Sequence, residues 1–169
     1  MSGALIVTAD LGPADFARLD GLRRAHFPPE RNQLSAHLTL FHALPPSLEG
    51  EVLAALKDEA RGPSPRATLS APYSLGNGVA YRILSNDLDD LRERLADRFH
   101  GSLSAQDGHG FRAHVTIQNK VEARFARALL NELAAAHHDR PLAIAALSLH
   151  RYLGGPWESL GRFAFRGLS

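Results

Sequence analysis

The chain of 169 residues contains no cysteine. The absence of cysteine excludes a disulfide scaffold, a zinc site with thiolate ligands and a cysteine nucleophile, and it is compatible with a reducing compartment. No segment approaches the roughly 20 consecutive apolar residues that cross a bilayer. The N-terminal apolar run has no basic leader and is too short for a signal peptide. We therefore expect a cytoplasmic protein, most simply a monomer, that does not contact membranes.

An excess of charge of either sign is also missing. The 19 lysine and arginine residues balance 18 aspartate and glutamate residues, which leaves a formal net charge of +1. Such a charge is too small to attract nucleic acid through a broad field. Lysine itself is scarce, with only Lys57 and Lys120, so the basic residues are nearly all arginine. Arginine suits phosphate recognition, although a skewed genome composition would give the same count.

The length suits one domain, residues 1–169, and hydrophobic periodicity predicts an α+β fold. Helices are predicted at 13–27, 48–60, 87–100 and 122–138. Strands are predicted at 4–9, 35–44, 111–118, 142–152 and 159–167, with two more between 66 and 85 that Gly76-Asn77-Gly78 joins as a hairpin. The expected helix caps are Ser47 for the second helix and Asn86 or Asp87 for the third.

One four-residue pattern occurs twice, as HLTL at 37–40 and as HVTI at 114–117. The chain has nine histidines and only four threonines, and two of those threonines follow a histidine by two places. Random placement predicts about 0.2 such pairs. The β propensity of threonine would explain one copy as an ordinary strand. It explains two copies poorly.

The spacing places the histidine and the threonine of each copy on the same face of a strand, while the apolar residues between them anchor the strand in the core. Two such units across a cleft would aim two imidazoles and two hydroxyls at one point. This arrangement fits displacement at phosphorus without a metal: one imidazole deprotonates water and the other protonates the departing ribose oxygen. The hydroxyls donate to the phosphoryl oxygens. The symmetry of the motifs leaves open which histidine is the base.

Paired H-x-[ST]-apolar motifs in this order resemble the 2H phosphoesterases, in particular the bacterial 2′-5′ RNA ligase-like, RNA 2′,3′-cyclic phosphodiesterase group. The likeness runs through "HLTLFHALP", "GFRAHVTIQNKV" and "HRYLGGPWESLGRFAF". It implies a bilobal fold, with two pseudo-twofold-related lobes of antiparallel sheet, helices packed outside and a central groove. It also implies opening of a 2′,3′-cyclic phosphate, on RNA ends or small nucleotides, to a 2′-phosphate without metal or other cofactor. His37 and His114 would be the acid/base pair, and Thr39 and Thr116 the hydroxyls that hold the phosphate.

Four further residues are candidates for substrate binding. Phe41 follows His37 by four places, so in a regular strand it shares the His37 face and could stack on a base. Close relatives carry an arginine shortly after the second motif, which Lys120 or Arg112 could replace here. Arg151 flanks the last hairpin and could form a groove wall. Trp157, in the same hairpin, is interpreted as a packing residue.

The remaining histidines do not predict a metal site. His42 and His109 each lie five residues from a motif histidine. In a regular strand this odd spacing turns His42 away from His37, and no carboxylate lies within either motif. The histidines at predicted helix ends are interpreted as structural, because a cation there complements the helix dipole: His26, His100, His137 and His138.

Three alternatives to RNA-end hydrolysis remain open. A 2′-5′ RNA ligase would run the same chemistry towards joining, if the groove positions a 5′-hydroxyl in place of water. The substrate could also be another small cyclic phosphate, such as an ADP-ribose derivative. Finally, the protein could be a non-catalytic module whose histidines only bind the phosphate of an RNA end.

Overall fold

The computed structural model describes residues 3–167, so residues 1–2 and 168–169 of the predicted 1–169 domain lie outside the description. The helices are α1 (Pro13–His26), α2 (Glu49–Glu59), α3 (Asn86–Arg98), α4 (Ala105–Gly108) and α5 (Ala123–Ala136), with 3-10 turns at Pro29–Arg31 and Pro46–Leu48. The strands are β1 (Leu5–Leu11), β2 (Leu38–Leu44), β3 (Arg66–Ser74), β4 (Val79–Leu84), β5 (His114–Gln118), β6 (Arg140–Tyr152) and β7 (Trp157–Ala164). Within residues 3–167, no helix is long and apolar enough to cross a membrane.

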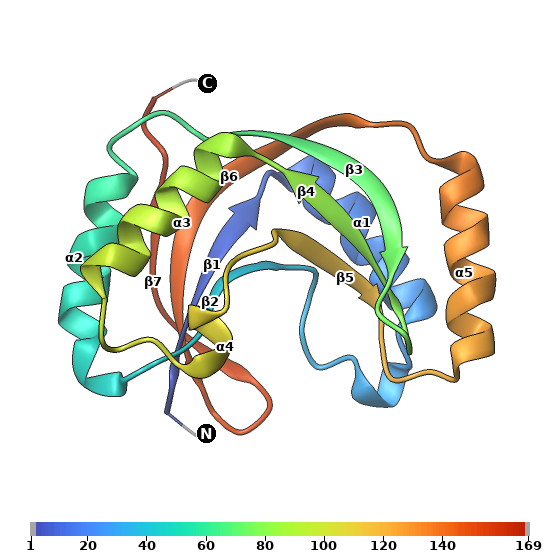
Figure 1. Ribbon diagram of the computed structural model, residues 1–169, viewed down its shortest axis with the longest axis horizontal. Helices are drawn as coiled ribbons and strands as arrows, with labels where there is room; N and C mark the ends of the chain where they lie inside the picture. The colour runs from blue at the N-terminus through green and yellow to red at the C-terminus, as the bar shows by residue number, and fades with distance from the viewer. Residues whose placement is uncertain (1–2, 168–169) are drawn as a thin grey trace.

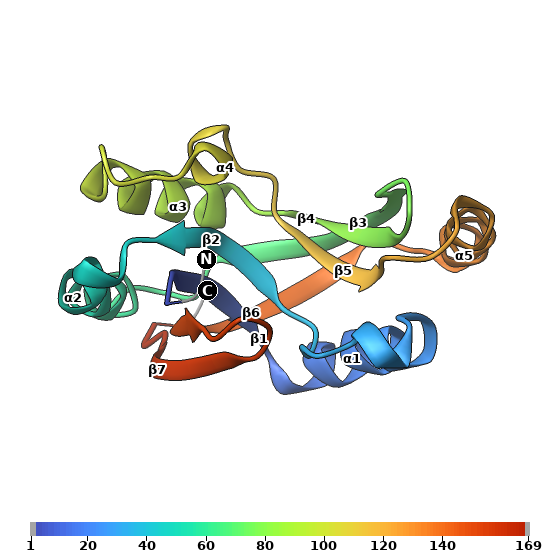
Figure 2. The ribbon, with the colours of Figure 1, turned by 90° about the horizontal axis from the view of Figure 1, so that it is seen from below.

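All strand pairs form one antiparallel sheet, in the order β2-β1-β6-β3-β4-β5, with β7 paired to β6. The long strand β6 connects the two halves of the sheet. Its first residues pair with β3, on the side of β4 and β5, and its later residues pair with β1 and β7. Figure 1 shows the sheet curled, with α2 and α3 at one end and α5 at the other. In Figure 2, α3 and α1 lie on opposite sides of the strands. The α+β class with a curled antiparallel sheet is therefore confirmed.

Two helix caps differ from those predicted. The cap of α3 is Ser85, whose hydroxyl accepts a hydrogen bond from the Leu88 amide at 3.0 Å and donates one to the Arg66 carbonyl at 2.6 Å. Ser85 is still in an extended conformation at the end of β4, as a cap residue must be, so Asn86 lies inside the helix. Ser47 does not cap α2, because it lies within the preceding 3-10 turn.

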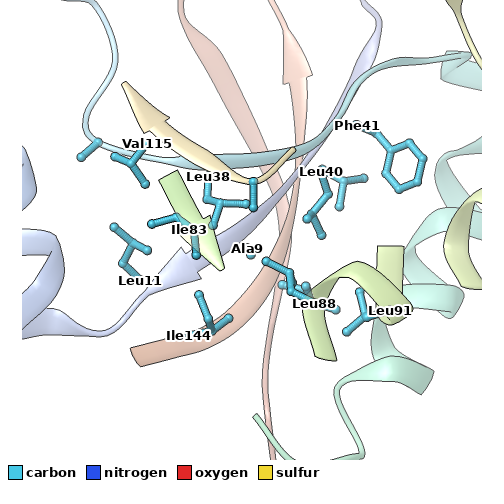
Figure 3. Packing of buried hydrophobic residues seen from close by; sticks show 14 of the residues in the cluster. Ala9, Leu11, Leu38, Leu40, Phe41, Ile83, Leu88, Leu91, Val115 and Ile144 are labelled. Atoms are coloured by element: carbon cyan, nitrogen blue, oxygen red, sulfur yellow. The ribbon is translucent and has the colours of Figure 1, made fainter. Parts of the chain in front are cut away.

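The apolar residues of the two histidine motifs anchor their strands in the core, as predicted. Leu38 and Leu40 on β2 are 0% and 1% exposed, and Val115 and Ile117 on β5 are both 0% exposed. Figure 3 shows Leu38 and Val115 on the side of Ile83, a residue of β4, and Leu40 on the side of Leu88, a residue of α3. The motif histidines and threonines consequently lie on the other face of their strands.

A β-bulge interrupts β2 directly after its motif. Thr8 of β1 pairs with Thr39, but the preceding residue of β1, Val7, pairs with Phe41, so Leu40 is the extra residue. A bulge displaces the alternation of side chains by one position. Leu40 and Phe41 are therefore both buried, at 1% and 0% exposed, and His42 faces the side of His37. The predictions that Phe41 shares the His37 face and that His42 opposes it are wrong for this reason.

Candidate active site

The structure brings the four motif residues together. His37 precedes β2 directly and Thr39 lies within it, while His114 and Thr116 are on β5. These four line one cavity of about 170 Å³, which Ile6, His42 and Trp157 complete. Each motif side chain is half-buried, supported by the strand below it and open toward the cavity.

The two motif imidazoles are held in the same way. Nδ1 of His37 lies 2.7 Å from the Ser35 carbonyl oxygen, and Nδ1 of His114 lies 2.9 Å from the Arg112 carbonyl oxygen. A carbonyl oxygen only accepts, so Nδ1 carries the proton in both rings. The neutral form of each histidine then has its lone pair on Nε2, away from the backbone. In both motifs the histidine Nδ1 donates to the backbone carbonyl two residues before it, so the two motifs have the same local geometry.

His37 is held in its neutral form by its surroundings. Burial lowers the pKa of His37 from 6.5 to about 4. The hydrogen bond to Ser35 opposes this lowering, whereas the positive charges of Arg23, His114 and His150 add to it. At neutral pH the His37 imidazole is thus a free base that can accept a proton.

Trp157 and His150 extend the site beyond the two motifs. The Trp157 ring meets the His37 ring edge to face at 4.9 Å between centroids, and it contacts the His150 ring at 5.1 Å. All three side chains line an adjoining cavity of about 320 Å³. Trp157 is therefore a site residue rather than only a packing residue. In the register of the hairpin Trp157 pairs with Tyr152, two residues after His150, a relation that the sequence alone did not show.

A polar chain behind His150 fixes that ring. His150 Nε2 lies 3.0 Å from Thr8 Oγ1, and the Thr8 hydroxyl donates to Asp10 Oδ1 at 3.1 Å. Asp10 Oδ2 also accepts from Ser148 at 2.6 Å and from Arg162 at 3.1 Å. Because the Thr8 hydroxyl donates to Asp10, it accepts from His150, which places the His150 proton on Nε2. Burial lowers the pKa of His150, although the charge of Asp10 opposes this effect.

Arg23 joins the first helix to the second motif. Its guanidinium donates to Asn32 Oδ1 at 2.8 Å and to the Thr116 carbonyl at 3.2 Å, and it lies 4.3 Å from the centre of the Phe27 ring. Its side chain is only 4% exposed. Arg23 thus places a positive charge beside the motif strand β5. The sequence showed it only as one arginine of a helix.

Two of the four predicted substrate-binding residues border the site. Arg112 is exposed on a cavity of about 500 Å³ that His114 and Thr39 also line. Lys120 is exposed on a different cavity, of about 640 Å³, which it shares with Arg23 and Trp157. Lys120 also has a left-handed backbone, with φ of 63°. These two cations flank the histidine cavity.

The other two candidates are not available to a substrate. Phe41 is fully buried, with the Arg92 guanidinium 4.1 Å from its ring centre, so it cannot stack on a base. Arg151 follows His150 on β6 and therefore faces the opposite side of the sheet. There it pairs with Glu49 and Glu158. Both predictions are corrected by the structure.

Between residues 3 and 167, no group of three or more histidine, cysteine, aspartate or glutamate side chains could hold a metal ion. What the site offers instead is two imidazoles with free Nε2 atoms, two hydroxyls and two flanking cations. Such a set can move two protons and hold an anion.

Comparison with known proteins identifies relatives of the chain by fold and by family. Three solved structures share the fold over nearly the whole of both chains. They are TT0787 of Thermus thermophilus (18% identity, TM-score 0.63, 97% of this chain and 98% of that one), a protein described as a phosphoesterase (20%, 0.60, 98% and 99%) and E. coli LigT complexed with 3′-AMP (20%, 0.58, 98% and 99%). No curated protein matches the chain. Residues 11–156 match the family model of the 2′-5′ RNA ligase superfamily, and the chain belongs to that family.

Proposed function

We propose that the protein is a metal-independent phosphodiesterase that opens the 2′,3′-cyclic phosphate of RNA ends or small nucleotides to a 2′-phosphate. The observation that carries the proposal is the common cavity of His37, Thr39, His114 and Thr116. The family also supports a phosphodiester substrate. The equivalent anchoring of the two imidazoles supports a pseudo-twofold relation between the halves that carry them.

In the proposed mechanism His37 is the base, because its pKa of about 4 leaves it unprotonated at neutral pH. It takes a proton from a water molecule whose oxygen forms a bond to phosphorus. The bond from phosphorus to the ribose 3′-oxygen breaks, and protonated His114 gives its proton to that oxygen. Thr39 and Thr116 donate to the non-bridging oxygens as charge builds on them. His37 then releases its proton and His114 regains one from solvent.

Arg112 and Lys120 extend this proposal to the rest of the substrate. They lie on separate cavities on the two flanks of the histidines, so each could bind a phosphate next to the reacting one. A substrate with several nucleotides would reach at least one of them, whereas a mononucleotide would not need them. The E. coli protein LigT has been solved with 3′-AMP, ATP and NADP+, which supports a nucleotide ligand for this site as well.

The test is hydrolysis of 2′,3′-cyclic nucleotides and of a short RNA with a cyclic phosphate end, in the presence of EDTA. We expect turnover by the wild type, and a loss of at least about 100-fold in rate for His37→Ala and for His114→Ala. The exposed His100 provides the matched control, since His100→Ala removes an imidazole outside the site. Joining of RNA ends in place of hydrolysis would favour the ligase. Binding of phosphate without turnover at any pH would indicate a non-catalytic binding module.

A further inference from the structure

A third histidine lines the cavity of the two motifs. The bulge at Leu40 turns His42 toward His37 and Thr39, although the spacing in sequence predicts the opposite. The His42 side chain is 42% exposed, so a ligand in the cavity can reach it. His42 also lines the neighbouring cavity that contains Arg112, and it therefore lies where the two spaces meet. The mechanism above does not use it.

A buried carboxylate orients this imidazole. Asp107, whose side chain is 0% exposed, has Oδ1 3.2 Å from His42 Nδ1. The same carboxylate accepts hydrogen bonds from the backbone amides of His42 at 2.8 Å and Ala43 at 2.9 Å. Burial alone would raise the pKa of the Asp107 carboxyl, but these hydrogen bonds outweigh burial and the pKa is lowered. Asp107 is thus ionised at neutral pH, and Nδ1 of His42 carries the proton that faces it.

Arg92 holds the carboxylate and the bulge together. Its guanidinium donates to the Leu40 carbonyl at 3.0 Å and to the Asp107 carbonyl at 2.7 Å, and it is 6% exposed. The Asp107 amide is in turn bonded to the Ser104 hydroxyl at the start of α4. Three segments that are distant in sequence, from β2, α3 and α4, therefore fix one imidazole. With Nδ1 turned toward Asp107, Nε2 points away from the protein interior.

We infer that His42, positioned by Asp107, is a third functional histidine whose Nε2–H donates a hydrogen bond to the phosphoryl group of the substrate. The inference rests on the proposed function and adds a residue to it. Because Nδ1 donates to Asp107, a ring that also donates from Nε2 is an imidazolium, which would lie between the Asp107 carboxylate and the bound phosphate. Such a charged donor is stronger than a hydroxyl. It stabilises charge that increases on the phosphoryl oxygens during the reaction and transfers no proton.

Other charged or titratable groups face the same space and belong to the electrostatics of His42. They are His37 just before β2, Tyr73 on β3, His114 and Arg112 around the start of β5, Arg92 on α3, and Asp107 and His109 in and after α4. Asp107 is the one carboxylate among them. Asp107 is therefore the group that balances a positive charge on His42.

The kinetic test compares His42→Ala, His42→Gln and Asp107→Asn with the wild type on a 2′,3′-cyclic nucleotide. The His42 substitutions keep the backbone amide that binds Asp107, so the loop remains anchored. We expect His42→Ala to lower kcat about 100-fold with a smaller change in KM, as for a lost transition-state donor. His42→Gln supplies an uncharged donor and should recover at least about tenfold of this loss. His100→Ala is the control for removal of an imidazole and should match the wild type.

The binding test follows the histidine Cε1–H resonances by NMR as inorganic phosphate is added, with His42 assigned from the His42→Ala spectrum. We expect added phosphate to shift the His42 signal in the wild type and to shift it less in Asp107→Asn. The His100 signal should stay in place. Two results would each overturn the inference, because both are expected of a purely structural His42. One is a kcat of His42→Ala within about twofold of the wild type, and the other is a His42 NMR signal that does not shift when phosphate is added. If the wild type turns over no cyclic phosphate, the proposed function fails, and the phosphate titration alone decides the role of His42.

Discussion

The low pKa of His37 predicts how the stability of the protein responds to acid. The folded protein binds a proton at His37 only near pH 4, whereas the unfolded chain binds it near pH 6.5. Between these values the unfolded state holds more protons, so acidification from pH 6.5 to 4 lowers the free energy of unfolding. A shift from 6.5 to about 4 corresponds to about 3 kcal/mol. Solvent in the cavity screens the half-buried ring, so we expect between about 1 and 3 kcal/mol.

The perturbation that isolates this effect is His37→Gln, which keeps a polar side chain of similar size without a titration. Urea unfolding is measured at several pH values between 7 and 4 for both proteins. The carboxylates and His150 titrate in both, so their contributions largely cancel in the difference. We expect the wild type to lose about 1 to 3 kcal/mol more than the variant over this range. Parallel pH profiles for the two proteins would refute the argument that burial keeps His37 neutral.

The same pKa sets the pH dependence of catalysis. If His37 is the base, the acidic limb of kcat/KM on a 2′,3′-cyclic nucleotide reports its pKa in the free protein. The limb should then lie near pH 4 rather than near the ordinary value of 6.5. An acidic limb between pH 6 and 7 would assign the base role to another group.

Three substitutions test other parts of the structure. Phe41→Ala should cost about 3 to 5 kcal/mol in urea unfolding, because its ring is fully buried; a cost below about 1 kcal/mol would contradict the placement. Gly78→Ala should lower both stability and activity, because a Cβ at residue 78 would overlap the Gln118 carbonyl at the end of the motif strand β5. The control is Gly50→Ala in α2, where a Cβ meets open space, and it should leave both properties nearly unchanged. Arg151→Ala should leave kcat/KM on the cyclic nucleotide within about twofold of wild type, and a larger loss would mean that it reaches the substrate.

The shared face of each histidine–threonine pair was predictable because it depends on local geometry alone. Within a strand the alternation of side chains follows from the backbone, so His37 and Thr39 had to share a face wherever the strand was placed. The same holds for His114 and Thr116. The apolar neighbours specified which face is buried. No knowledge of the pairing partners was needed.

The residues that were misassigned depend on pairing between distant segments. The bulge at Leu40 arises from the register of β2 against β1, and it exchanges the environments of Phe41 and His42. Arg151 is adjacent to His150 in sequence, but the position of β6 inside the sheet decides which of the two faces the cavity. Asp107 comes from the short helix α4, 65 positions after His42. Periodicity within one segment contains no information about any of these relations.

The sheet order has a consequence for the spacing of the catalytic groups. The motif strands β2 and β5 stand at the two ends of the order β2-β1-β6-β3-β4-β5, with four strands between them, yet His37 and His114 line one cavity. Each strand in a sheet is rotated relative to its neighbour, and these rotations accumulate. The distance between the two imidazoles is therefore a measure of the curvature of the whole sheet. Substitutions in the first half of β6 that flatten or increase the curvature of the sheet would change the reaction rate by moving the two histidines apart or together.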